Sequence, residues 1–121
     1  MKQLNSISDT SANLLYPIYE GDCIDEEIID KLGYDISPLV NFQFSKTIKI
    51  YTLGKMPFDY IVFLGMGSRN TITKRKMIQA IENALSIMDN KINIWIDKLE
   101  TFNLDIHEIT QIVAKTIALS E

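Results

Sequence analysis

The sequence Tyr-Ile-Val-Phe-Leu-Gly-Met-Gly at residues 60–67 decides the fold. Its first five residues are all apolar, which is typical of a central strand buried on both faces. A helical pattern follows from about Thr73 to Asp89, and its apolar positions share one face: Met77, Ile81, Ala84, Leu85 and Met88. Isoleucines then alternate over residues 92–96, as in a strand. A strand, a helix of about four turns and a second strand predict a parallel βαβ crossover, and hence an α/β fold with a partly parallel sheet.

The segment before this unit predicts a further strand and a short helix. Residues 13–19 form an apolar run, and Pro17 indicates that the strand ends near the proline or lies at an edge of the sheet. Asp25 is well placed to cap a helix, and Gly33 is well placed to end it. The expected buried stripe of this helix is Ile24, Ile28, Ile29 and Leu32.

The remaining segments predict a loop, a strand and a final helix. Residues 34–45 resemble a loop, in which alternating apolar residues are expected to cover part of the core: Val40, Phe42 and Phe44. A period-two pattern from Lys46 predicts a strand that ends at Gly54. The last helix is predicted over residues 105–121. No glycine, proline or cationic turn closes it, so we expect the chain to be part of a longer one.

Composition limits the possible functions. The 121 residues suffice for one domain, and the net charge of −4 argues against a dedicated nucleic-acid binder. With only Cys23 and His107, the chain can form no internal disulfide and no zinc site of the usual Cys/His spacing. No apolar run approaches the roughly 20 residues of a membrane span. We therefore expect a cytoplasmic protein with no membrane partner.

Three segments in this order resemble the N-terminal domain of the leucyl aminopeptidase (cytosol aminopeptidase) family. The first is Leu-Leu-Tyr-Pro-Ile-Tyr-Glu-Gly at residues 14–21, before a short acidic helix. The second is Ile-Val-Phe-Leu-Gly-Met-Gly at residues 61–67, before a helix opened by Thr73, and the third is the terminal helix from Ile109 to Ser120. The resemblance covers residues 12–121.

The resemblance implies a three-layer α/β domain similar to macro domains, with a mixed sheet and helices on both faces. Members of the family are two-metal exopeptidases, carrying zinc or manganese, that release N-terminal residues such as leucine and assemble as hexamers. Their metal and catalytic residues lie in a C-terminal domain, and none of those motifs occurs in residues 1–121. We accordingly assign no catalytic and no metal-binding residue to this chain. Its expected partners are the missing catalytic domain of the same polypeptide and further copies of itself.

The turn between the predicted central strand and helix is the most site-like feature. Two glycines before a helix N-terminus can present backbone N–H groups to an anion. The candidate anion site comprises Gly65, Gly67, Ser68, Arg69 and Lys74. The alternative interpretation is that the glycines only allow close packing of helix on sheet. The sequence also departs from the aminopeptidase pattern here, because that family usually has acidic residues where this helix begins with Lys-Arg-Lys at residues 74–76.

Other charged or reactive residues have structural explanations as well as functional ones. The basic cluster Arg69, Lys74, Arg75 and Lys76 fits either a phosphate, a nucleic acid or an acidic surface, or a solvated helix end. The acidic residues Asp22, Asp25, Glu26, Glu27 and Asp30 are explained better by helix capping than by a metal site, with Lys31 as their one nearby counter-charge. His107 and Cys23 are expected to be unreactive, and Trp95 to pack in the core.

The sequence leaves open two functions from different classes. The first is a non-catalytic N-terminal domain of a cytosolic leucyl aminopeptidase, which serves assembly and access to the active site. The second is a stand-alone macro-like module that binds a phosphorylated nucleotide or another anion at residues 65–76. Contact with DNA through the basic cluster is a third, weaker hypothesis.

Overall fold

The computed structural model describes residues 2–3, 12–88, 92–101 and 104–120 as a mixed α/β fold. The strands are β1 (Lys2–Gln3), β2 (Asn13–Ile18), β3 (Thr47–Tyr51), β4 (Tyr60–Gly65) and β5 (Ile92–Ile94). The helices are α1 (Glu26–Leu32), α2 (Lys74–Leu85) and α3 (Ile106–Ser120), with 3-10 turns η1 (Ser37–Leu39) and η2 (Ile96–Leu99). The sheet order is β1-β5-β2-β4-β3, in which β3 is antiparallel to β4 and the other pairs are parallel.

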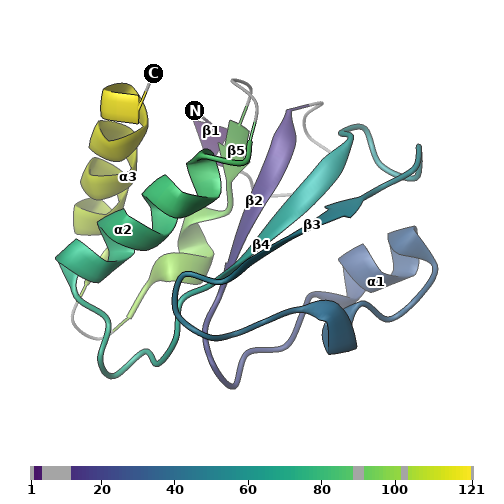
Figure 1. Cartoon of the computed structure of the whole chain (residues 1–121), viewed down its shortest axis with the longest axis horizontal. Coiled ribbons are helices and arrows are strands. Elements are labelled where there is room, and N and C mark those ends of the chain that lie inside the picture. The colour runs from purple at the N-terminus through teal and green to yellow at the C-terminus, as the bar shows by residue number, and fades with distance from the viewer. Residues whose placement is uncertain (1, 4–11, 89–91, 102–103, 121) are drawn as a thin grey trace.

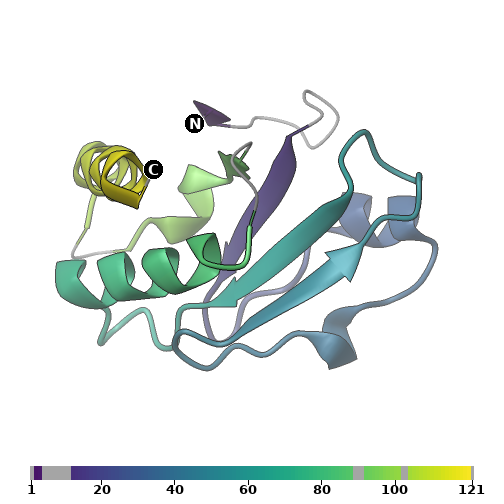
Figure 2. The same ribbon diagram turned by 45° about the horizontal axis from the view of Figure 1, so that its top comes forward.

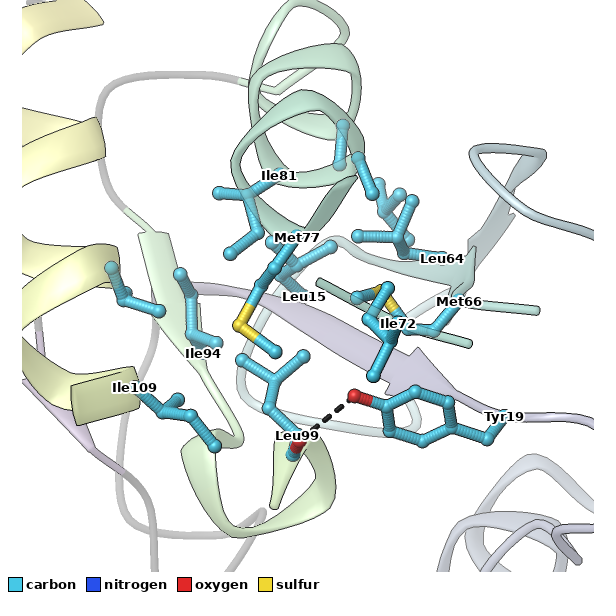
Figure 3. Close-up of a cluster of buried hydrophobic side chains, with 14 of the residues drawn as sticks. Leu15, Tyr19, Leu64, Met66, Ile72, Met77, Ile81, Ile94, Leu99 and Ile109 are labelled. Carbon is cyan, nitrogen blue, oxygen red and sulfur yellow. Dashed lines mark hydrogen bonds between the residues drawn. The ribbon is translucent and has the colours of Figure 1, made fainter. Parts of the chain in front are cut away.

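The sheet is the middle one of three layers, which is the arrangement that the resemblance implies. Helix α1 covers one face, and α2 and α3 lie together over the other (Figures 1 and 2). Alternate residues of β2 and β4 point to opposite faces, because side chains of a strand alternate. The α1-side core includes Leu14, Tyr16, Ile28, Leu32, Ile61 and Phe63. The α2–α3-side core includes Leu15, Leu64, Met77, Ile81, Ile94 and Ile109, and Figure 3 shows how these side chains fill the space between sheet and helices.

Strand β2 lies in the middle of the sheet, so the prediction of an edge strand at Pro17 is wrong. The other prediction, that the strand ends near Pro17, is confirmed. Pro17 pairs with Leu64 of β4, one residue before β2 ends. The Leu15 carbonyl accepts from the Trp95 N–H, and the Ile18 carbonyl accepts from the Met66 N–H. Since alternate residues of a parallel strand bond to opposite neighbours, Pro17 faces the side of β5. Strand β5 has already ended there, so the missing proline N–H costs no ladder bond.

The predicted starts of α1 and α2 and the glycine stop are confirmed, with one correction. Thr73 caps α2, because its hydroxyl oxygen accepts from the Lys76 N–H at 3.2 Å. Gly33 ends α1 in the left-handed conformation at φ 85°. Asp25 does precede α1, but its carboxylate makes no capping hydrogen bond. That carboxylate is turned instead toward Lys98, a residue that the sequence prediction did not consider.

Three of the predicted elements end earlier than the sequence pattern indicates. Helix α2 ends at Leu85, and Asp89 lies outside the described residues. Strand β5 ends at Ile94, because the chain then turns into η2. Strand β3 ends at Tyr51, and the next hydrogen bond to the β4 side runs from the Thr52 N–H to the Asp59 carbonyl.

The loop before β3 lies against both cores, as predicted in outline. Val40 is buried and Phe42 packs with it against the α1-side core, whereas Phe44 packs against the α2–α3-side core. Trp95 is partly buried in the α1-side core and meets the Tyr16 ring edge-on, with ring centroids 5.6 Å apart. Among the residues described, no helix has the length and apolar character of a membrane span.

Candidate functional site at the carboxyl ends of the parallel strands

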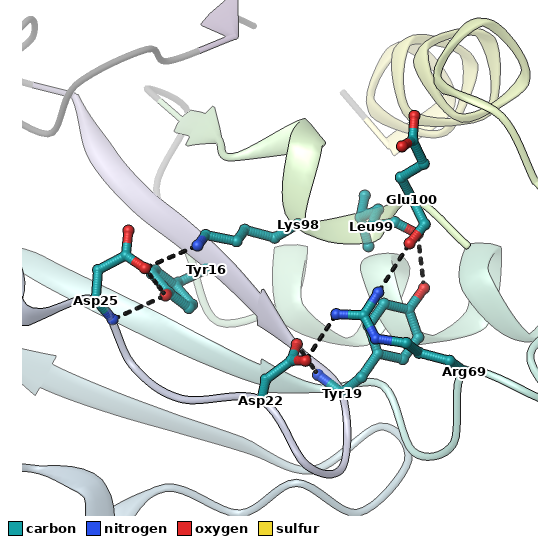
Figure 4. Close-up of polar contacts among 8 residues, drawn as sticks. All are labelled: Tyr16, Tyr19, Asp22, Asp25, Arg69, Lys98, Leu99 and Glu100. Atoms are coloured by element: carbon teal, nitrogen blue, oxygen red, sulfur yellow. Dashed lines mark hydrogen bonds and ion pairs between the residues drawn. The ribbon is translucent and has the colours of Figure 1, made fainter. Parts of the chain in front are cut away.

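The carboxyl ends of β2, β4 and β5 bring three loops together. Helix α1 follows β2 on one face of the sheet and α2 follows β4 on the other, so the chain diverges between these two neighbouring strands. Ligands of open α/β sheets usually bind at such a point. Figure 4 shows the charged and aromatic side chains that meet there: Tyr16, Tyr19, Asp22, Asp25, Arg69 and Lys98.

The backbone N–H groups of the glycine turn are already bonded within the chain. The Gly65 N–H donates to the Lys46 carbonyl at 2.8 Å, and the Met66 N–H donates to the Ile18 carbonyl at 2.8 Å. The Gly67 N–H donates to the Phe42 carbonyl at 3.0 Å. A ligand near this turn would therefore have to be held by other groups.

The glycines of the turn allow the loop before β3 to approach the end of β4. A Cβ atom built on Gly65 would lie 2.1 Å from the Gln43 carbonyl oxygen and 2.6 Å from that of Asn41. Gly67 has φ 73° and lies against Phe44. Close packing thus explains both glycines, but the element that packs on them is the loop at residues 41–44 rather than a helix.

Arg69 joins the three loops. Its guanidinium donates to the Asp22 carboxylate at 2.7 Å and to the Glu100 carbonyl at 2.9 Å. It also lies over the Tyr19 ring, 4.5 Å from the centroid. The same Asp22 carboxylate accepts from the Tyr19 N–H at 3.0 Å, which fixes the turn after β2. Arg69, one of the two cations of the candidate anion site, is consequently paired with groups of its own chain.

The Tyr19 hydroxyl provides a second link between the loops, below the guanidinium. It is buried and donates to the Leu99 carbonyl at 2.8 Å, as Figure 3 also shows. Burial raises the pKa of Tyr19 to about 12, an effect that the nearby Arg69 charge partly opposes. The hydroxyl therefore keeps its proton, and with it the hydrogen bond, across the neutral pH range.

Asp25, Tyr16 and Lys98 form a separate cluster on the α1 side of the sheet. The Asp25 carboxylate accepts from Lys98 Nζ at 2.8 Å and from the Tyr16 hydroxyl at 3.2 Å. Burial holds the pKa of Tyr16 well above its ordinary value, and the Asp25 carboxylate beside it adds to the same effect. Lys98 also lies over the Trp95 ring, 4.9 Å from the centroid. These contacts hold η2 against the start of α1.

A cavity of about 320 Å³ lies beside the glycine turn. It is lined by Glu20, Gln43, Phe44, Met66, Gly67, Ser68, Thr71, Ile72 and Lys76. Two of the five candidate site residues, Gly67 and Ser68, line it. Lys74 instead pairs with Glu108 of α3 at 3.3 Å. The structure thus divides the candidate site and adds Lys76, whose ammonium lies 5.9 Å from the centroid of the Phe44 ring.

The acidic residues after β2 have more partners than their sequence neighbours indicate. Asp22 and Asp25 pair with Arg69 and Lys98, which correct the expectation that Lys31 is their one counter-charge. The other acids of this segment, Glu26, Glu27 and Asp30, are exposed on α1. Within the described ranges, no three His, Cys, Asp or Glu side chains gather as a metal site would require.

The two remaining candidate residues lie apart from the cavity. His107 is exposed in the first turn of α3, and Cys23 is exposed between Asp22 and the start of α1.

No known protein-family model matches the chain, and no curated protein sequence is significantly similar to it. The resemblance to the aminopeptidase N-terminal domain therefore stays a prediction.

Proposed function

We propose that this chain is a non-catalytic N-terminal domain of a metal-dependent leucyl aminopeptidase. In this proposal the domain serves assembly and shapes access to an active site that lies in a C-terminal domain of the same polypeptide. The parent enzyme would be cytoplasmic, would use zinc or manganese and would form a homo-oligomer. The three-layer fold with a mixed sheet is the architecture that the resemblance implies.

The main support for this proposal is that charged groups at the strand ends already form ion pairs within the chain. Arg69 and Lys98 are bonded to Asp22 and Asp25, and each pair ties loops together that are far apart in sequence. A substrate site needs charged groups that face the ligand, whereas these groups hold the loops in place. Such an arrangement suits a rigid accessory domain better than an active site.

The same two carboxylates fit a divalent metal poorly. Asp22 and Asp25 lie in the segment that follows β2, and each already has a cation as its partner. Binding a metal would displace Arg69 or Lys98 and leave a half-buried cation without its partner, which is costly. We accordingly place the metal of the parent enzyme in its other domain.

The alternative module for a phosphorylated nucleotide is favoured by one observation, the cavity at the glycine turn. Lys76 and Ser68 line it and could contact a phosphate. Calorimetry with ADP-ribose separates the two functions. Heat of binding that disappears in Lys76→Ala would favour the module, and no heat at millimolar ligand would exclude it.

The isolated chain is expected to have no peptidase activity. Its hydrolysis of leucine p-nitroanilide with added zinc or manganese should equal that of a heat-killed sample, because the proposed metal ligands belong to the other domain. Metal-dependent hydrolysis above that control, repeated in an independent preparation, would contradict the proposed function.

A further inference from the structure

A groove about 510 Å³ in volume lies between α2 and α3, and all of its lining residues belong to these two helices. It is lined by Lys74, Ile78, Glu82, Glu108, Gln111, Ile112, Lys115 and Thr116. The two isoleucines are partly buried. Among the charged residues of the groove, Lys74, Glu82 and Lys115 are exposed and Glu108 is half-buried. The groove shares no lining residue with the cavity beside the glycine turn.

The charged residues of the groove follow a regular order. Along α2, a lysine, an isoleucine and a glutamate follow one another at helical spacing: Lys74, Ile78 and Glu82. Along α3 the order is reversed: Glu108, Ile112 and Lys115. The Lys74–Glu108 ion pair, at 3.3 Å, shows that both rows begin at the same end of the groove. The face therefore carries two antisymmetric rows of charge with an apolar centre.

Such a face is complementary to itself. In a two-fold dimer both subunits use the same patch. The row of charges on α2 then faces either the α2 row of the second subunit, in the opposite direction, or its α3 row. If α2 faces α2 of the second copy in the antiparallel sense, Lys74 meets the second Glu82, and Glu108 meets the second Lys115. If α2 instead faces α3, Lys74 meets the second Glu108, and Glu82 meets the second Lys115. Both arrangements place opposite charges together and bring the isoleucines into contact.

We propose that the α2–α3 face is the site at which two copies of this chain associate. The proposal does not depend on the aminopeptidase function, because it uses only the charge order and the apolar centre of the groove. Helices of 12 and 15 residues are about 18 and 22 Å long, which limits the face that they offer to a few hundred Å². A stable interface buries about 800 Å² on each partner, so this face suits a weak dimer.

Sedimentation equilibrium of the full chain over a series of concentrations tests the proposal. The apparent mass should rise from 13.9 kDa toward about twice that value as the concentration enters the upper micromolar range. Glu82→Lys should weaken association by roughly tenfold, because by symmetry it turns two attractive contacts into two repulsive ones. Lys115→Glu should do the same.

Asp30→Lys is the matched control, since it makes the same change of charge at an exposed position on α1, on the other face of the sheet. Its association should match that of the unsubstituted chain. Two double variants distinguish the arrangements. Lys74→Glu with Glu82→Lys should restore association only where α2 faces α2, whereas Glu82→Lys with Lys115→Glu should restore it only where α2 faces α3.

Three results would overturn the proposal. The first is a mass of 13.9 kDa at every concentration, which would leave the groove for a different partner such as another domain. The second is an equal effect of Glu82→Lys and Asp30→Lys, which would show that net charge rather than this face controls association. The third is restoration by neither double variant. Circular dichroism of each variant confirms that the helices are intact.

Discussion

Gly65→Ala is expected to lower the free energy of unfolding by about 3–5 kcal/mol, a large share of the stability of a small domain. The new methyl group would lie 2.1 Å from the Gln43 carbonyl oxygen and 2.9 Å from the Phe42 carbonyl carbon. Both are backbone atoms, so no side-chain rotation can relieve the overlap. The loop must move away, and this movement disturbs the hydrogen bonds of Gly65 with Ser45 and Lys46.

Urea unfolding, followed by circular dichroism, measures the effect. Gly54→Ala is a suitable comparison, because Gly54 has φ 84° but a Cβ there would meet nothing within 4 Å. That variant should lose only about 1 kcal/mol, the cost of placing an alanine in the left-handed region. If both variants lose the same amount, the close approach between the loop and the end of β4 is wrong.

Tyr16→Ala is expected to be the most damaging change in the polar cluster, with a loss of about 3–5 kcal/mol. The Tyr16 ring is fully buried in β2 and lies 5.2 Å from the Phe63 ring and 5.6 Å from the Trp95 ring, between centroids. Its removal opens a cavity under α1. It also deprives the Asp25 carboxylate and backbone N–H of a partner.

Tyr16→Phe separates the contribution of the ring from that of the hydroxyl. The phenylalanine keeps the aromatic contacts and loses only the hydrogen bonds to Asp25, so its expected cost is about 1 kcal/mol. Both variants are compared by urea unfolding, with the fluorescence of Trp95 as a local probe. Equal losses in the two variants would mean that the ring contributes little to the core, contrary to the packing described above.

The elements predicted best from the sequence are those whose pattern is local. The continuous apolar run of β4 indicates burial on both faces, and the helical spacing of apolar residues in α2 indicates one buried face. The Thr73 cap and the Gly33 stop depend on neighbouring residues alone. The ends of β3 and β5 were placed too late, because their alternation continues in residues that turn away from the sheet. Periodicity does not reveal such a turn.

The candidate site was harder to predict, because its contacts join distant parts of the chain. Asp22 and Arg69 are 47 residues apart, and Asp25 and Lys98 are 73 residues apart. No spacing rule relates such pairs. The glycine turn looked like an anion cradle because its sequence does not show that the loop at residues 41–46 accepts the N–H groups of Gly65 and Gly67. The one available signal was that each acidic residue needs a basic partner. Many basic residues of the chain satisfy that condition, so the signal does not identify the pair.

The proposed place of this chain at the N-terminus of a metallopeptidase is tested most directly by the native product in its source cells. An antibody raised against residues 12–121 is used to capture that product, and its mass and its hydrolysis of leucine p-nitroanilide are then measured together. The proposal predicts a polypeptide several times heavier than 13.9 kDa whose hydrolysis is lost with a metal chelator and restored by zinc or manganese. A product of 13.9 kDa without peptidase activity would contradict the proposal.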